Sequence, residues 1–107
     1  MRPEELFIGC HLSAGKGWEA MGKDALSIGA TTFAFFTRNP RGGNAKALDE
    51  ADVAKLRKLL EVNHFGPLVA HAPYTMNLCS AKEETRDFAR RALTEDLERM
   101  EYLPGNY

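Results

Sequence analysis

The fold of this 107-residue chain follows from residues 31–36, which read Thr-Thr-Phe-Ala-Phe-Phe. Branched and aromatic side chains dominate this stretch, and such residues favour β-strands. On its N-terminal side, Trp18, Met21, Ala25 and Ile28 recur at three- and four-residue spacing. That spacing is typical of the buried face of a helix. We therefore expect a helix that leads into a strand.

The same alternation extends in both directions along the chain. Short apolar runs at residues 6–10 and 68–70 predict two more strands. Asp49 is the expected N-cap of a second helix. The inward positions of this helix are Val53, Leu56 and Leu60.

A third helix is expected after residue 80, because Ser80 and Glu83 have the spacing of a capping box. Its predicted inward stripe is Ala89, Leu93, Leu97 and Met100. Residues 104–107 then resemble a turn that leads into a fourth strand.

The predicted order is β-α-β-α-β-α, and this alternation indicates an α/β fold with a parallel sheet. Three such units fit either an open doubly wound sheet or the first part of a (β/α)8 barrel. A closed barrel of this type takes about 250 residues. We therefore expect residues 1–107 to form a single domain with an incomplete architecture.

Bulk properties limit the classes of function. The formal net charge is −1, so the chain as a whole does not attract nucleic acid, and DNA contacts would depend on local groups. Cys10 and Cys79 form no CxxC pair, which fits a reducing compartment. The sequence contains no apolar run long enough for a membrane helix. These features predict a cytoplasmic protein with no membrane partner.

The histidines differ in their predicted positions. His11 and His71 each follow a predicted strand, so both are expected at the carboxyl edge of the sheet, where α/β folds place functional groups. His64 precedes its strand and belongs to the opposite edge. Imidazole is a favoured zinc ligand, but a catalytic zinc needs about three protein ligands, and no convincing third one is present.

Two loops offer contacts for a nucleic acid. Residues 37–44 include Arg38, Arg41 and two asparagines, which suit phosphate binding, although a solvated polar loop is an equally simple interpretation. Tyr74 lies in the loop after residues 68–70 and could stack on a base or pack the loop down.

One motif is misleading. Gly17, Gly22 and Lys23 match the start of a phosphate-binding loop, but Asp24 stands where that motif needs Ser or Thr. The match also lies within the periodic pattern of the first helix. We therefore reject a nucleotide-binding role for it.

Residues 8–14, 33–41 and 71–78 together resemble the endonuclease IV family of zinc-dependent apurinic/apyrimidinic endonucleases. The resemblance implies a (β/α)8 TIM barrel with a three-zinc cluster, which incises double-stranded DNA 5′ to abasic sites in base excision repair. It implies that His71 is a zinc ligand. It also implies that Arg41 and Tyr74 enter the DNA stack, with Asn39 in the same recognition loop.

The chain departs from the family pattern in two ways. Gly42 and Gly43 follow Arg41 where many relatives carry bulkier side chains. The remaining zinc ligands and the attacking base are expected beyond Tyr107, so a three-zinc cluster cannot be completed from His71. The resemblance assigns no ligand role to His11.

Two alternatives remain open. The parent protein could be a sugar isomerase or epimerase of the xylose isomerase-like barrels, which share this architecture. The chain could also be a truncated, non-catalytic product that associates with itself through the open edge of the third strand.

Overall fold

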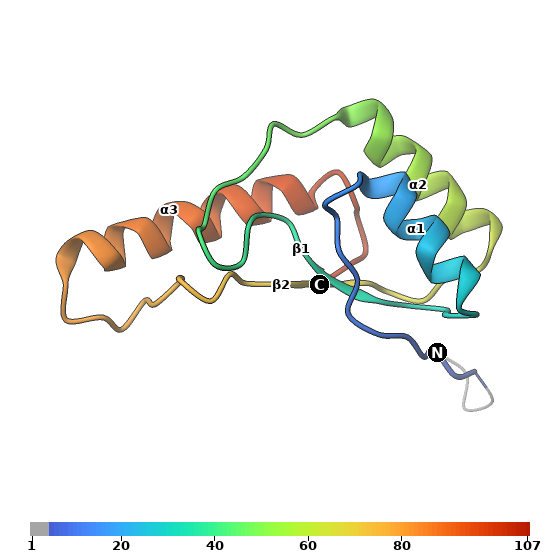
Figure 1. The fold of residues 1–107 in the computed structure, drawn as a ribbon, viewed down its shortest axis with the longest axis horizontal. Coiled ribbons are helices and arrows are strands. Elements are labelled where there is room, and N and C mark those ends of the chain that lie inside the picture. Colours follow the sequence, from blue (N-terminus) through green and yellow to red (C-terminus); the bar gives the residue numbers. More distant parts are fainter. Residues whose placement is uncertain (1–4) are drawn as a thin grey trace.

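The computed structural model describes residues 5–107, in which three helices are combined with a small parallel sheet (Figure 1). In chain order the elements are α1 (Trp18–Ser27), β1 (Ala34–Phe36), α2 (Glu50–Val62), β2 (Val69–His71) and α3 (Glu83–Met100). None of these helices is long and apolar enough to cross a membrane.

The sheet grows in chain order. Strand β1 pairs with β2 in parallel, with Ala34 opposite Val69 and Phe36 opposite His71. The extended residues 8–12 lie along the other side of β1, and a parallel bridge joins His11 to Ala34. Parallel neighbours in sequence order are what a β/α barrel requires.

The C-terminal residue continues this order. The backbone N–H of Tyr107 donates to Leu68 at 2.9 Å, and its C=O accepts from Ala70 at 2.6 Å. Tyr107 therefore lies parallel to β2, in agreement with the predicted turn into a fourth strand. It also occupies part of the β2 edge that was expected to be open.

Helices α1 and α2 cover one face of the sheet. The core on this face is formed by Trp18, Met21, Ala25, Ala30, Phe33, Phe35, Val53, Leu56, Leu68 and Leu103. The rings of Trp18 and Phe35 meet edge to face with centroids 5.1 Å apart. Gly22 brings the helices together, since a Cβ there would lie 2.7 Å from Cδ1 of Leu56. This packing explains why Gly22 does not belong to a phosphate-binding loop.

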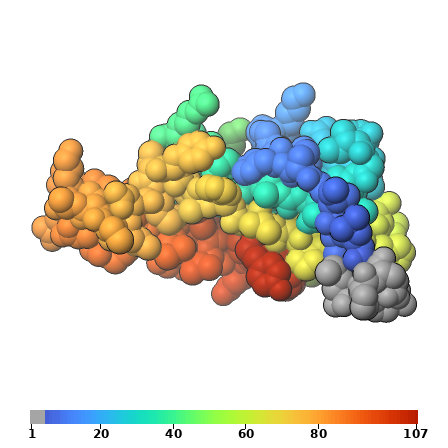
Figure 2. All heavy atoms as spheres, turned by 90° about the horizontal axis from the view of Figure 1, so that it is seen from below, coloured from blue at the N-terminus to red at the C-terminus, as the bar shows by residue number. Residues whose placement is uncertain are grey.

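The opposite face of the sheet has no helix over it within the described residues. Side chains alternate between faces along a strand, so Phe36, Val69 and His71 point away from the side on which Phe35 and Leu68 are buried. Figure 2 shows β2 and the residues that follow it, in yellow, at the surface beside the red C-terminal end.

The end signals of α1 and α2 are confirmed, but Ile28, which was expected on the buried face of the first helix, is the C-cap of α1 and is exposed. Asp49 is the N-cap of α2 and accepts a hydrogen bond from the backbone N–H of Asp52. Gly29 has a φ of 73° just after the C-cap Ile28, as expected for a left-handed helix end. The carboxylate of Asp52 has an additional role, because it accepts hydrogen bonds from the first backbone N–H groups of α1.

The prediction of a strand at residues 6–10 was wrong in part. These residues are extended, but they form no regular strand, and Leu6 and Ile8 are exposed. Their hydrogen bonds run to one neighbour only, on the β1 side. The expected burial on both faces would need further elements that residues 5–107 do not supply.

Two expectations for α3 were also wrong. Lys82 is its N-cap and has no side-chain cap, while the Ser80 hydroxyl accepts from the Lys82 N–H instead of closing a box with Glu83. The buried residues of the helix are Ala89 and Ala92. Of the predicted stripe, Ala89 is buried and Met100 packs against the core, whereas Leu93 and Leu97 are exposed among the residues that the structure describes.

Candidate functional site at the carboxyl edge of the sheet

Four aromatic rings meet where the parallel segments end. The ring of Phe36 lies 4.6 Å from His11, 4.8 Å from His71 and 5.2 Å from Tyr74, measured between centroids. The two histidine rings are 6.0 Å apart. The expectation that His11 and His71 share one edge of the sheet is therefore confirmed. The third histidine, His64, comes just after α2 and before β2, away from this cluster.

The His71 ring has a defined hydrogen-bond partner. Its Nδ1 lies 2.5 Å from the carbonyl oxygen of Ala72. A carbonyl can only accept, so Nδ1 carries the proton and donates. This tautomer leaves Nε2 as the nitrogen with a lone pair available to a metal ion, in the usual pattern of a histidine ligand held by a carbonyl.

The chemistry of these donors suits zinc, but their number does not complete a site. A catalytic zinc has three protein ligands and one open position. Across residues 5–107, no group of three or more His, Cys, Asp or Glu side chains could hold a metal ion. The ligand role expected of His71 therefore stays a prediction, and no such role is assigned to His11.

The two loops that the sequence singled out are joined. The backbone N–H of Tyr74 donates to the carbonyl of Pro40 at 2.8 Å. The Tyr74 side chain is 67% exposed beside the His71 ring. The loop after β2 therefore supports the loop after β1, and an exposed aromatic ring stands at the junction.

Asn39 shapes the loop that carries Arg41. Its Oδ1 accepts from the N–H groups of Arg41 and Gly42 at 3.0 and 3.2 Å. Its carbonyl accepts from the N–H of Gly43, whose φ of 76° closes the turn. These bonds leave the Arg41 side chain exposed on a compact turn.

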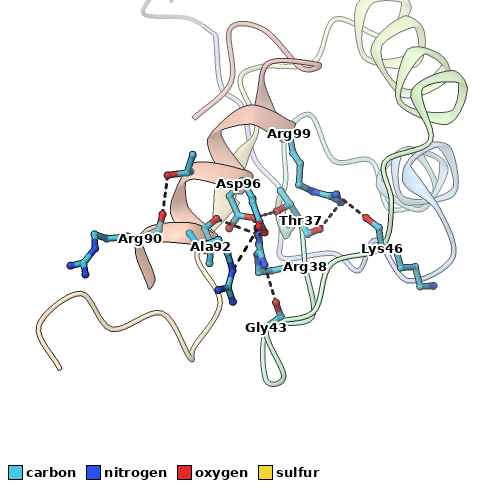
Figure 3. A network of polar contacts seen from close by, with 11 residues as sticks. Thr37, Arg38, Gly43, Lys46, Arg90, Ala92, Asp96 and Arg99 are labelled. Atoms are coloured by element: carbon cyan, nitrogen blue, oxygen red, sulfur yellow. Dashed lines mark hydrogen bonds and ion pairs between the residues drawn. The ribbon is translucent and has the colours of Figure 1, made fainter. Parts of the chain in front are cut away.

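Arg38 differs from Arg41 and is not available to a phosphate. Its Nε donates to Asp96 at 2.9 Å and its NH2 to Glu95 at 2.8 Å, both on α3 (Figure 3). A third bond runs from NH1 to the carbonyl of Gly43. The interpretation of Arg38 as a phosphate contact is therefore corrected. Its partners lie 57 and 58 residues away in sequence, and no local pattern identifies them.

The surroundings of Arg38, which is buried, and Arg99, which is half-buried, affect the pKa values of the two guanidinium groups in opposite directions. Burial lowers the pKa of Arg38, but its hydrogen bonds to Glu95 and Asp96 outweigh this and raise the pKa above its ordinary value. Burial also lowers the pKa of Arg99, and the nearby Asp96 only partly offsets it. Both remain charged at neutral pH, because the ordinary pKa of arginine lies far above 7.

The parallel order of the segments and the histidines at their carboxyl ends define a β/α protein of the barrel type. The chain belongs to the family of xylose isomerase-like TIM barrels, whose model matches residues 23–107. The fold class predicted from the sequence, a partial (β/α)8 barrel, is confirmed.

Two of the most similar individual proteins carry a more specific name than the family model does. Over 102 residues the chain is 63% identical to a probable endonuclease 4 of Alkaliphilus oremlandii, covering 95% of this chain and 36% of the relative. A probable endonuclease 4 of Akkermansia muciniphila is also 63% identical, with 94% and 36% covered. The resemblance to endonuclease IV proteins is therefore confirmed. The chain spans little more than a third of the length of these relatives.

A solved structure agrees with the sequence comparison. The crystal structure of endonuclease IV from Thermus thermophilus superimposes with a TM-score of 0.83 at 33% identity. The match covers 92% of this chain and 37% of that one. Residues 5–107 thus have the arrangement of part of such a barrel.

Proposed function

We propose that the complete protein containing this chain is a zinc-dependent endonuclease that incises DNA 5′ to abasic sites in base excision repair. One observation carries the proposal. His71, Tyr74 and the Arg41 loop come together at the carboxyl edge of the sheet, joined by the Tyr74–Pro40 hydrogen bond and the ring contacts. The similarity to proteins named endonuclease 4 supports the same reaction.

Each residue has a proposed task. His71 supplies one zinc ligand through Nε2, held in orientation by its bond to Ala72. When bound in a complete site, zinc polarises the scissile phosphodiester and lowers the pKa of a water molecule. Arg41 binds phosphate or enters the duplex, and Tyr74 stacks in the gap left by the displaced nucleotide. Asn39 keeps the Arg41 loop in shape.

The residues described here do not account for catalysis by this chain alone. A group of three metal donors is lacking among residues 5–107, so zinc-dependent incision needs ligands from elsewhere in the complete protein. We expect the 107-residue chain by itself to be inactive on abasic DNA.

The test compares three variants of the complete protein. His71→Ala should lose zinc and incision together, because it removes a ligand. Tyr74→Ala should retain zinc and weaken incision about 10- to 100-fold, as expected for loss of a stacking side chain. His64→Asn is the matched control, since it changes a histidine near the opposite edge of the sheet, and it should leave both quantities unchanged.

The measurements are zinc content and incision of a duplex with one abasic site. Normal zinc content in His71→Ala would contradict the ligand role, and loss of zinc in Tyr74→Ala would contradict the stacking role. A wild-type protein that holds zinc but leaves abasic duplexes intact would overturn the proposed function. Metal-dependent turnover of free sugars without DNA binding would favour the isomerase alternative.

Self-association of the chain stays a separate proposal. Tyr107 pairs with part of the β2 edge, which leaves less of that edge for a second copy. Light scattering of the chain decides this point, because a monomer at high concentration would contradict pairing through the sheet edge.

A further inference from the structure

The loop after β1 is tied to α3 at three points along its length. At its start, the Thr37 hydroxyl donates to Asp96 at 2.6 Å. In its middle, Arg38 bridges Asp96 and the carbonyl of Gly43. Near its end, the carbonyl of Lys46 accepts from Arg99 at 2.8 Å, and the same guanidinium donates to the carbonyl of Thr37 at the start of the loop, also at 2.8 Å (Figure 3). We call Thr37, Arg38, Asp96 and Arg99 the loop anchor.

The loop anchor is largely removed from water. The Arg38 side chain is 3% exposed and the Asp96 side chain 13%. A buried ion pair is weak evidence for stability, because apolar residues of the same volume often stabilise a protein as well or better. Such a pair does fix geometry, since charge-assisted bonds from a planar guanidinium are directional.

The anchored points enclose the turn that carries Arg41. Asn39 and Gly43 close this turn, and Arg38 holds the Gly43 carbonyl. Gly43 also rests on α3, since a Cβ there would lie 2.5 Å from the ring of Phe88. A shift of the anchor would therefore move the backbone on both sides of Arg41.

We propose that the loop anchor positions Arg41 for DNA, so that α3 controls the affinity for the abasic duplex through residues that do not touch it. This inference rests on the proposed function, in which Arg41 contacts DNA. It assigns Arg38 and Asp96 as positioning residues. The two arginines of this loop then have different roles, because Arg38 holds the loop in place and Arg41 contacts the DNA.

The test is a double-mutant cycle in the complete protein, with KM and kcat measured on the abasic duplex. Asp96→Asn keeps the size of the side chain but removes its charge. It should raise KM about tenfold, equal to about 1.4 kcal/mol, and leave kcat within about twofold. Arg41→Ala should raise KM by a similar factor. In the Arg41→Ala background, Asp96→Asn should lose most of its effect, because both changes act through one contact.

Two further variants make the result specific. Arg38→Lys keeps a positive charge but cannot bond Asp96, Glu95 and Gly43 at the same time, so it should raise KM as Asp96→Asn does. Glu98→Gln changes an exposed carboxylate on the same helix, outside the anchor, and should leave KM unchanged. If the effects of Asp96→Asn and Arg41→Ala multiply, or if Arg38→Lys has a normal KM, the inference is wrong.

Limited trypsin digestion reports whether the loop anchor keeps Arg38 inaccessible, and it does so independently of catalytic activity. In the wild-type protein, trypsin should cut after the exposed Arg41 and not after the buried Arg38. In Asp96→Asn, cleavage after Arg38 should appear while the circular dichroism stays native. Equal cleavage after Arg38 in both proteins would overturn the anchor itself. A wild-type protein that does not bind abasic DNA would instead refute the proposed function, whatever the digestion pattern.

Discussion

Helices α1 and α2 are attached to the rest of the molecule differently from α3. The first two bury large apolar side chains against one face of the sheet, among them Met21 and Leu56. Helix α3 buries two alanines, packs Met100 against the core at its C-terminal end and is joined to the loop after β1 through charged groups, while Leu93 and Leu97 stay exposed. Figure 1 shows α1 and α2 side by side in one half of the molecule, with α3 extending into the other half.

The difference separates stability from positioning. Apolar burial is non-directional and contributes free energy roughly in proportion to the area removed from water. Charged hydrogen bonds contribute less net free energy but fix angles and distances. The α1–α2 half thus supplies the core on which the sheet rests, and α3 holds the loop that carries Arg41.

The largest loss in the free energy of unfolding is expected from Leu56→Ala. Leu56 is fully buried between α1 and α2, and its truncation leaves a cavity, so the free energy of unfolding should fall by about 3 kcal/mol. Urea unfolding of the chain measures this loss. Val62→Ala, on the exposed side of α2, is the control and should cost less than about 0.5 kcal/mol. Equal losses of unfolding free energy in the two variants would show that burial of Leu56 does not hold α1 and α2 together.

A smaller loss in the free energy of unfolding is expected from Asp96→Ala. It removes one carboxylate from buried Arg38, but Glu95 and the Gly43 carbonyl remain as partners. The cost should be about 2 kcal/mol, below the range for a fully broken buried pair. Glu98→Ala is the control for loss of a carboxylate on the exposed side of α3. A cost for Asp96→Ala above that of Leu56→Ala would mean that α3 also carries the main stability.

The two attachments also explain how much could be predicted from the sequence. The spacing of Trp18, Met21 and Ala25 identified the buried face of α1, because apolar packing leaves a periodic pattern. The same reasoning held only in part for α3, where Ala89 is buried and Met100 packs against the core but Leu93 and Leu97 are exposed. The polar contacts of α3 with the loop after β1 join residues more than 50 positions apart in sequence, and such contacts leave no local pattern.

The candidate site was predictable to a similar extent. The positions of His11 and His71 after strands placed them at one edge, because parallel strands end together. The grouping of Arg38 with Arg41 was wrong, since a polar loop sequence does not distinguish a buried guanidinium from an exposed one. The sequence analysis did not identify the cap that Asp52 provides for α1. An acidic residue in the first turn of α2 is explained by the dipole of its own helix, and Trp18 lies 34 residues away in sequence.

This cap gives the third prediction. The Asp52 carboxylate accepts from the N–H groups of Trp18 at 2.7 Å and Glu19 at 3.0 Å, which have no intrahelical partners. Asp52→Ala should cost about 1 kcal/mol, the usual effect of losing an N-cap. Hydrogen exchange should show faster exchange at these two amides, whereas Asp24→Ala on the exposed side of α1 should leave them protected. Unchanged exchange in Asp52→Ala would show that α1 does not need the cap.

The smallest change in the free energy of unfolding is expected from Leu97→Gln. Leu97 is 61% exposed, so a polar side chain should change the free energy of unfolding of this chain by less than about 0.5 kcal/mol. Leu103→Ala provides the contrast, because Leu103 follows α3 closely but is buried in the core and should cost about 3 kcal/mol. A loss above about 1 kcal/mol in Leu97→Gln would mean that the apolar contacts of α3 in solution extend beyond Met100 and the buried alanines. The division between a packed half and an anchored half would then not hold.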